Sequence, residues 1–324
     1  MSGLVINGDG VRLRAADPAD RPAGQWWTIV DPQSGQVLGT IGLTDGVVDV
    51  EVVPAARRRG VATAALRALS RWAFEAGHRR LEVLTTWENA IAQRVAMAAG
   101  YQREGVRRGA CAGVDMLPFA RLAGDPPGPT PRLLPDLPGG ELTDGVVTLR
   151  PLDAGDIGFY TDLHAVPDVI ETSVPPARPS AEDVRRRCTS AAAHWLAGTR
   201  ADLVIVDTAS GAPTGVMGLF YQEPATGQAM IGYSQLPAWR RLGYPTRAAQ
   251  LLSLWVFAET AIARLIAGTM PANVGSQRVL EKAGFTREGY LRSRLPGRDG
   301  KRVDDVQFVL LPEDVLARTA DAQG

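Results

Sequence analysis

The sequence is poor in lysine, histidine and cysteine, and it has no excess of either charge. Only Lys282 and Lys301 are lysines among 35 basic residues, and 35 acidic residues balance them, so the formal net charge is zero. A neutral chain has no general field to attract nucleic acid or an acidic membrane surface. Cys111 and Cys188 match no metal-ligand spacing. We expect free thiols in a reducing compartment, with a single disulfide as the less favoured alternative, and no metal site.

Long apolar runs are also absent. No run reaches about 18 apolar residues, the length that a membrane span needs, and the N-terminus lacks the charged and apolar regions of a secretion signal. The 324 residues are 45% hydrophobic and 22% charged, which is typical of a globular protein with room for two domains. We therefore expect a cytoplasmic protein that does not associate with membranes.

A glycine preceded by basic residues occurs twice, each time directly before an apolar helical pattern. Gly60 follows Arg58 and Arg59, and Gly243 follows Arg241. The first N–H groups of a helix have no partner within it and carry partial positive charge, which suits a phosphate. One such string is a weak signal, because a basic turn commonly just caps its helix. Its recurrence favours an anion-binding turn in two copies.

Other landmarks repeat in the same order. Residues 11–14 correspond to 147–150, and residues 28–31 correspond to 204–207. The second copy carries an insertion from 157 to about 196 that the first copy lacks, with helical patterns at 157–165 and 181–196 around a proline-rich bend. The chain is therefore an internal duplication whose first copy is shortened.

The predicted fold class is α/β: two tandem modules, 1–123 and 145–324, each a mixed twisted sheet flanked by helices. The six prolines of 124–144 predict a stiff linker without a core of its own. Expected strands in the first copy are 27–30, 37–43, 47–53, 80–85 and 114–121, with helices at 63–75 and 91–99. In the second copy we expect strands at 203–206, 216–221, 230–236, 264–269 and 304–311, and helices at 246–261 and 276–283.

Strand, basic glycine turn, helix and strand are followed in both copies by an asparagine, a second helix and a Gly-Tyr or Gly-Phe pair. This order resembles the GNAT (Gcn5-related N-acetyltransferase) superfamily, and within it the RimJ/RimL type. The resemblance implies transfer of an acetyl or other short acyl group from acetyl-CoA to a primary amine by direct attack. It implies no metal. The implied partner is a small-molecule or peptide N-terminal amine, nucleic acid is not expected, and a homodimer stays open.

In that family the glycine turn binds the pyrophosphate of acetyl-CoA, the preceding strand splays from its neighbour, and one of its backbone N–H groups polarises the thioester. The implied cofactor contacts are Val53, Arg58, Arg59, Gly60, Val61, Ala62, Thr63 and Asn89 in the first copy, and Leu236, Arg241, Leu242, Gly243, Tyr244, Thr246, Asn273 and Ser276 in the second. The two asparagines would contact the pantetheine arm, cap the following helix, or do both. Pro245 departs from the pattern because it offers no N–H.

Catalytic candidates differ between the copies. Ser276 matches the family serine that returns a proton to the thiolate, and the first copy has Ala92 there. Glu51 lies where the family often places its general base, and Tyr233 lies in that strand of the second copy. The other carboxylates that we consider as bases or acceptor-binding groups are Asp168, Glu171, Glu223, Asp304 and Asp305.

We expect the second copy to hold most of the catalysis and the first to keep a CoA turn without an acceptor wall. Two rival functions stay open: a non-catalytic protein that binds or senses CoA, and an acyl or aminoacyl transferase that depends on tRNA or a carrier protein. The zero net charge disfavours tRNA.

Overall fold

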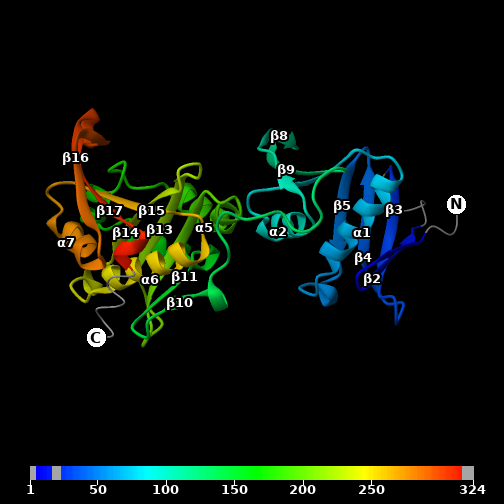
Figure 1. Ribbon diagram of the computed structural model, residues 1–324, viewed down its shortest axis with the longest axis horizontal. Helices are drawn as coiled ribbons and strands as arrows, with labels where there is room; N and C mark the ends of the chain where they lie inside the picture. Colours follow the sequence, from blue (N-terminus) through cyan, green and yellow to red (C-terminus); the bar gives the residue numbers. More distant parts are fainter. Residues whose placement is uncertain (1–4, 17–22, 316–324) are drawn as a thin grey trace. The chain divides into compact units, whose positions relative to one another are not determined.

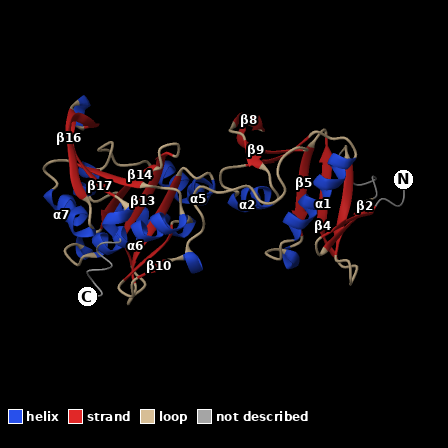
Figure 2. Ribbon diagram, in the orientation of Figure 1, coloured by secondary structure: helices blue, strands red, loops and turns tan. Residues whose placement is uncertain are grey.

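The computed structural model describes residues 5–16 and 23–315. The chain divides into two units, Met1–Pro131 and Arg132–Gly324, each built of strands and helices (Figures 1 and 2). Among the helices of the described ranges, none combines the length and the apolarity that a membrane crossing requires.

Within its described residues, the first unit contains one large sheet and two α-helices. Its strands run in the order β1-β2-β3-β4-β5-β6-β9-β7, with β8 paired to β9. The strands are β1 (Val5–Gly8), β2 (Val11–Ala15), β3 (Gln25–Val30), β4 (Val37–Thr44), β5 (Val47–Val52), β6 (Arg80–Thr85), β7 (Gln102–Arg103), β8 (Arg107–Cys111) and β9 (Val114–Leu122), and the helices are α1 (Val61–Glu75) and α2 (Ala90–Ala98).

The second unit repeats this topology as β10-β11-β12-β13-β14-β15-β17-β16. Its strands are β10 (Leu142–Thr143), β11 (Val147–Pro151), β12 (Arg200–Asp207), β13 (Pro213–Glu223), β14 (Gln228–Gln235), β15 (Arg264–Thr269), β16 (Thr286–Pro296) and β17 (Arg302–Leu310). Its helices are α3 (Ile157–Leu163), α4 (Pro167–Thr172), α5 (Ala181–Leu196), α6 (Tyr244–Glu259) and α7 (Val274–Ala283). The predicted α/β class and the tandem repeat are confirmed.

The insertion of the second copy forms the helices α3, α4 and α5 between β11 and β12. The start of α5 follows from its sequence. Ser180 accepts a hydrogen bond from the backbone N–H of Asp183, and the Asp183 carboxylate accepts one from the N–H of Ser180. This reciprocal cap satisfies two N–H groups that the helix leaves unpaired.

The two sheets differ in how their faces are covered. In the first unit Leu13 and Ile29 are buried in one core with residues of α1 and α2, while Arg14 and Thr28, on the opposite face, are exposed or half-buried. In the second unit one core lies between the sheet and α6 and α7, and a smaller core on the other face includes Val204 and residues of α3 and α5. The insertion thus covers a sheet face that no described helix covers in the first unit.

The proline-rich segment is divided between the units. Thr130 donates hydrogen bonds from its N–H to Met97 and from its hydroxyl to Tyr101, both in the first unit. Leu134 and Leu137 are buried in the core of the second unit. The unit boundary therefore lies inside the expected 124–144 linker, because Thr130 bonds to the first unit and Leu134 and Leu137 pack in the second.

One pair of strands in each sheet is parallel, and this pair is short. β5 pairs with β6 at Val47 and Glu82, and β14 pairs with β15 only as far as Met230 and Ile266. Beyond these residues the strands diverge toward their C-terminal ends. Each gap opens directly before the glycine turn, as the family resemblance implies.

Candidate functional site

The two glycine turns share one backbone conformation. Gly60 and Gly243 have φ of 77° and 82°, and both are N-caps of the following helix, α1 or α6. Two residues earlier, Arg58 and Arg241 have φ of 60° and 63°. Arginine seldom adopts this left-handed region. Because the same conformation occurs at the same place in both copies, we infer that the surrounding structure, and not the preference of the arginine itself, imposes the shape of the turn.

The first turn presents free helix donors. In α1 the first helical hydrogen bond runs from Ala64 N–H to Gly60 O at 3.0 Å. The N–H groups of Val61, Ala62 and Thr63 precede this bond and lie at the positive end of the helix. The turn can therefore offer three backbone donors to an anion.

The second turn offers fewer donors. In α6 the first helical bond runs from Arg247 N–H to Gly243 O at 3.1 Å, and Pro245 lies among the residues that precede it without an N–H to give. The Tyr244 side chain is buried, and its hydroxyl donates to Asp207 at 2.6 Å. Tyr244 can therefore offer a ligand its backbone N–H at the start of α6, but its side-chain hydroxyl is already used.

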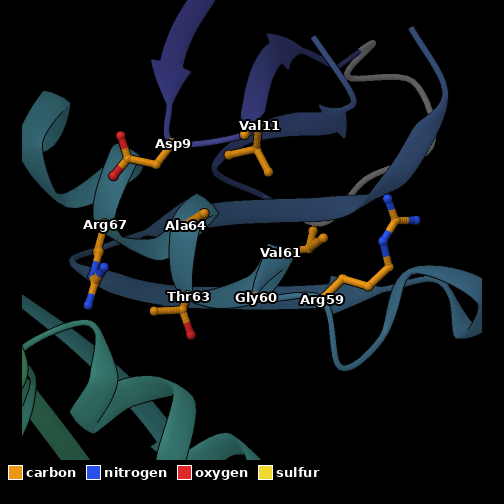
Figure 3. Close-up of a pocket in the computed structure, with 9 residues that line it drawn as sticks. Asp9, Val11, Arg59, Gly60, Val61, Thr63, Ala64 and Arg67 are labelled. Carbon is orange, nitrogen blue, oxygen red and sulfur yellow. The ribbon is translucent and has the colours of Figure 1, made fainter. Parts of the chain in front are cut away.

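The other predicted turn residues lie at the surface or just beneath it. Arg58, Arg59 and Gly60 are exposed, Ala62 and Thr63 are half-buried, and Val61 is buried; Arg241, Leu242 and Gly243 are exposed, and Thr246 is half-buried. A cavity of about 380 Å³ lies at the first turn (Figure 3). Its wall combines the start of α1 with Arg59, Arg67 and Asp9, so two cations outnumber one carboxylate.

An arginine holds the strand end before each turn. Arg57 Nε donates to Val52 O at 3.2 Å, and Arg240 Nε donates to Gln235 O at 3.3 Å. In an antiparallel pair the N–H and C=O of one residue point to the same side, and neighbouring residues alternate. The N–H groups of Val52 and Gln235 therefore point toward the strand gap.

Val53 and Leu236 face the other way. Their N–H groups donate to the carbonyls of Leu38 and Thr214 at 2.9 Å each. A thioester-polarising N–H on this strand thus fits Gln235 better than Leu236, which the sequence singled out. Contacts of acetyl-CoA with Val53 and Leu236 stay a prediction.

The second unit contains a cavity of about 550 Å³ at the gap between β14 and β15. Its wall includes Tyr233, Ser276 and Asn273, which the sequence had singled out. The structure thus brings together residues from β14 and from the start of α7. The residues that complete the wall on the side of α3 and α5 include Tyr160, His164, Arg187, Asp202 and Phe220.

Tyr233 and Ser276 form a hydroxyl pair. The Tyr233 hydroxyl lies 2.9 Å from Ser276 Oγ and donates to the Ser276 carbonyl at 3.1 Å. Burial raises the pKa of Tyr233 to about 12, so the phenol keeps its proton at neutral pH. Asn273 accepts from Ser276 N–H at 3.1 Å as the N-cap of α7. The pair can deliver a proton to a leaving thiolate in the strand gap.

The first unit lacks these hydroxyls. The strand registers place Val50 at the position of Tyr233, because Val50 pairs with Ile41 as Tyr233 pairs with Met217. Asn89 caps α2 by accepting from Ala92 N–H at 3.0 Å, so Ala92 takes the place of Ser276. Both asparagines therefore act as N-caps, and their contact with the pantetheine arm stays a prediction.

Glu51 is exposed on β5, opposite Thr40. It lies on the sheet face away from α1, where the first unit has no described helix to enclose an acceptor. Its role as a general base therefore stays a prediction, without an enclosed site around it.

Four of the other carboxylates are used elsewhere or point to solvent. Asp168 pairs with Arg240, Glu223 accepts hydrogen bonds in the β13–β14 turn, Asp304 accepts from Tyr290 and Ser293, and Glu171 is exposed. Asp305 alone among the considered carboxylates lines the cavity. Its exposed fraction is 2%, and its Oδ1 has no hydrogen-bond partner.

Sequence reasoning missed the cluster at the cavity wall next to α5. Asp202 is buried and forms ion pairs with Arg187 and Arg200, and the Arg187 guanidinium lies over the Phe220 ring at 5.7 Å. In the sequence, Arg187 lies in the run Arg185–Arg187, which by itself indicates only a solvated surface. A signal was present in the pattern, because Asp202 interrupts the apolar strand β12 and a carboxylate buried there needs a cationic partner.

Comparisons with known proteins match both halves of the chain. Residues 147–286 match the model described as "Acetyltransferase (GNAT) domain", and residues 9–101 match "Acetyltransferase (GNAT) family". The two matched ranges confirm the predicted family and its duplication.

Curated relatives come from Bacillus subtilis. The chain is 40% identical over 86 residues to the probable N-acetyltransferase YjcK. These 86 residues make up 26% of this chain and 48% of that protein. It is 32% identical over 84 residues to the uncharacterized N-acetyltransferase YnaD, 26% of this chain and 49% of that protein. The chain spans about half the length of these relatives.

Solved structures with similarity to part of this chain include two acetyltransferases. Mycobacterium smegmatis RimJ in complex with CoA-disulfide has 23% identity and a TM-score of 0.47, over 57% of this chain and 93% of that chain. RimL, described as a ribosomal L7/L12 alpha-N-protein acetyltransferase in complex with coenzyme A, has 19% identity and a TM-score of 0.47, over 52% of this chain and 96% of that chain.

Proposed function

Because the chain belongs to the GNAT acetyltransferase family, with two domains of that family in tandem, we propose that it transfers a short acyl group, in the first instance acetyl, from acyl-CoA to a primary amine. The single observation that carries the proposal is the Tyr233–Ser276 hydroxyl pair beside the gap between β14 and β15. The acceptor is a small molecule or a peptide with a free N-terminal amine.

Direct transfer follows from the residues at hand. Among the described residues that line the cavity there is no cysteine or lysine to carry the acyl group, which favours direct attack of the amine on the thioester. A backbone N–H on the gap side of β14 can stabilise the developing oxyanion, and the hydroxyl pair can return a proton to sulfur. The glycine turn of the same unit would hold the pyrophosphate.

We assign most of the catalysis to the second unit. Its insertion lines one side of the cavity, and this unit holds both hydroxyls, whereas the first unit has Val50 and Ala92 in their places. The first unit keeps the turn with the larger number of free N–H donors, so it serves as a CoA-binding site without an acceptor wall of its own.

The test is an assay of the full chain with acetyl-CoA and a panel of amines, with free thiol as the readout. The panel holds a short peptide with a free α-amine, a free amino acid, a polyamine and an aminoglycoside. Amine-dependent thiol release is expected, and its absence with every amine would rule the proposal out. Gly243→Asp should abolish turnover. If only Gly60→Asp abolishes turnover, the first unit and not the second is the catalytic one.

A further inference from the structure

Asp305 is a buried carboxylate with an unused oxygen in the cavity of the second unit. Its Oδ2 lies 3.2 Å from Arg294 Nε in an ion pair, and its Oδ1 has no hydrogen-bond partner. The carboxylate lies directly over Gly268 of β15, since a Cβ built on that glycine would come within 2.7 Å of both carboxylate oxygens. A buried acceptor atom without a donor is costly unless a ligand supplies one.

Asp305 lies on the sheet face opposite the one that α6 and α7 cover. Along β17 the residues Val306, Phe308 and Leu310 belong to the core under α6 and α7. Because side chains alternate along a strand, Asp305 points to the other face, which α3 and α5 cover. Tyr233 packs against the α6–α7 core and bonds Ser276 of α7.

The cavity at the strand gap is lined by Asp305 from one face of the sheet and by the hydroxyl pair from the other. This arrangement suits acyl transfer, because the attacking nitrogen and the leaving sulfur occupy different positions on the tetrahedral carbon and need a proton acceptor and a proton donor at separate places. A proton acceptor on the attacking side and a proton donor on the leaving side are then both in place.

Resting on the proposed function, we propose that Asp305 binds the acceptor amine in its ammonium form and takes a proton from it before attack. The substrate class is thereby narrowed to primary amines that are protonated when free in solution. Burial raises the pKa of Asp305, and Arg294 and the backbone N–H of Thr269 oppose that shift, so the carboxyl is a stronger base than an exposed aspartate.

The protons balance over the step. The ammonium gives one proton to Asp305 Oδ1, which leaves a neutral amine and a neutral carboxylic acid. The amine lone pair forms the N–C bond, the C–S bond breaks, and its electron pair goes to sulfur. The second proton of the nitrogen passes to water in the cavity. Ser276 gives its proton to sulfur and takes one from Tyr233, and water then reprotonates the hydroxyl pair. Asp305 then returns its proton to water.

The first unit has lost all three groups together. By register, Leu117 pairs with Thr85 as Val306 pairs with Thr269, so Met116 takes the place of Asp305. The joint absence of the three groups is expected if all three serve one reaction.

The experiment uses the full chain, acetyl-CoA and the most active amine of the panel. Asp305→Asn keeps the shape of the side chain and removes its basicity, and kcat/KM at neutral pH should fall by roughly 10²-fold or more. CoA binding by calorimetry should not change. The matched control is Asp304→Asn, because Asp304 bonds Tyr290 and Ser293 outside the cavity.

A pH profile gives a second readout that does not depend on how well the asparagine variant folds. Arg294 on β16 stabilises the carboxylate, so Arg294→Gln should raise the pKa of Asp305 and move the acid limb of kcat/KM to higher pH. The other titratable groups on the cavity wall are Tyr160, His164, Arg187, Asp202 and Tyr233. His164 is the rival base among them, and His164→Gln should leave the acid limb in place.

The outcomes separate the two proposals. If the wild type releases no amine-dependent thiol, the proposed function fails and this inference fails with it. If the wild type is active and Asp305→Asn keeps its rate, the inference alone is wrong. It is also wrong if the acid limb of kcat/KM shifts in His164→Gln and not in Arg294→Gln.

Discussion

Arg240, at the start of the second glycine turn, forms a two-point ion pair with Asp168 of α4. One of its hydrogen bonds, from Nη2 to Oδ1, is 3.0 Å long, and Arg240 also donates to the carbonyl of Gln235 at the end of β14. The counterpart Arg57 makes only the strand-end contact of this set, to Val52. The insertion therefore provides a link between α4 and the second glycine turn.

We expect this link to contribute little to stability. The Asp168 side chain is half exposed, and exposed ion pairs are worth about 0 to 1 kcal/mol. Arg240 lowers the pKa of Asp168, so the contribution is present at neutral pH and is lost as the pH falls through the lowered value. In urea titrations at pH 7, Asp168→Asn should lower the free energy of unfolding by less than about 1 kcal/mol. In acid, the wild type and the variant should have the same free energy of unfolding. A larger loss would mean that the pair holds the fold of α4.

Removal of the hydroxyl pair should reduce the rate of transfer. Tyr233→Phe and Ser276→Ala should each lower kcat by roughly 10²-fold, since each removes a positioned proton donor. The double variant should lose little more than either single variant, because the two hydroxyls act as one unit. Stopped-flow measurement of thiol release would show this.

The phenol pKa adds a directional test. With its pKa at about 12, Tyr233 stays protonated through the usual assay range. We expect the basic limb of the wild-type pH profile to be unchanged in Tyr233→Phe. A basic limb that disappears in this variant would show that the phenol ionises during turnover.

The two turns differ by one backbone N–H, which Ala62 has and Pro245 lacks, and substitutions can add or remove it. Pro245→Ala restores an N–H in the second turn, and Ala62→Pro removes one from the first. One hydrogen bond is worth about 0.5 to 1.5 kcal/mol, so CoA affinity should rise roughly 2- to 10-fold in the first case and fall by as much in the second. Each titration is made with the other turn blocked by a Gly→Asp change. Equal affinities before and after exchange would mean that these N–H groups do not contact the ligand.

The elements that the sequence predicted well are those with their own local signals. Strand β15 has the predicted bounds 264–269, and α5 has the predicted bounds 181–196. In β15 the apolar run is bounded by turn residues, and in α5 the Ser180–Asp183 cap marks the first turn. These features need no information about distant residues.

The parts that could not be predicted depend on pairing across the sheet. Strand β16 has few buried side chains and exists because it pairs with β17. Without β16 there was no reason to place Arg294 beside Asp305, and Asp305 was only one of several carboxylates. The same holds for Val50, since its match to Tyr233 needs the register of β5. Such contacts become visible only once the strands are aligned.

Asp305 should destabilise the folded protein at neutral pH if it serves the reaction and not the fold. Burial raises its pKa, so the folded state holds the proton more tightly than the unfolded state. The resulting stability is present below the unfolded pKa and is lost as the pH rises through the folded pKa. Asp305→Asn should therefore be as stable as the wild type or more stable at pH 7, and the gain should vanish in acid. A marked loss of stability at pH 7 would indicate a structural role.

The two units should unfold separately, because each has its own core. Leu66 is fully buried under the sheet of the first unit, and Leu252 is fully buried on α6 of the second. Truncation of either side chain to alanine costs about 2 to 5 kcal/mol. In calorimetry Leu66→Ala should lower only one of two transitions and leave thiol release intact, whereas Leu252→Ala should lower the other transition and weaken catalysis on heating. Transitions that shift together would show that the cores are coupled, and the division of labour would then need the whole chain.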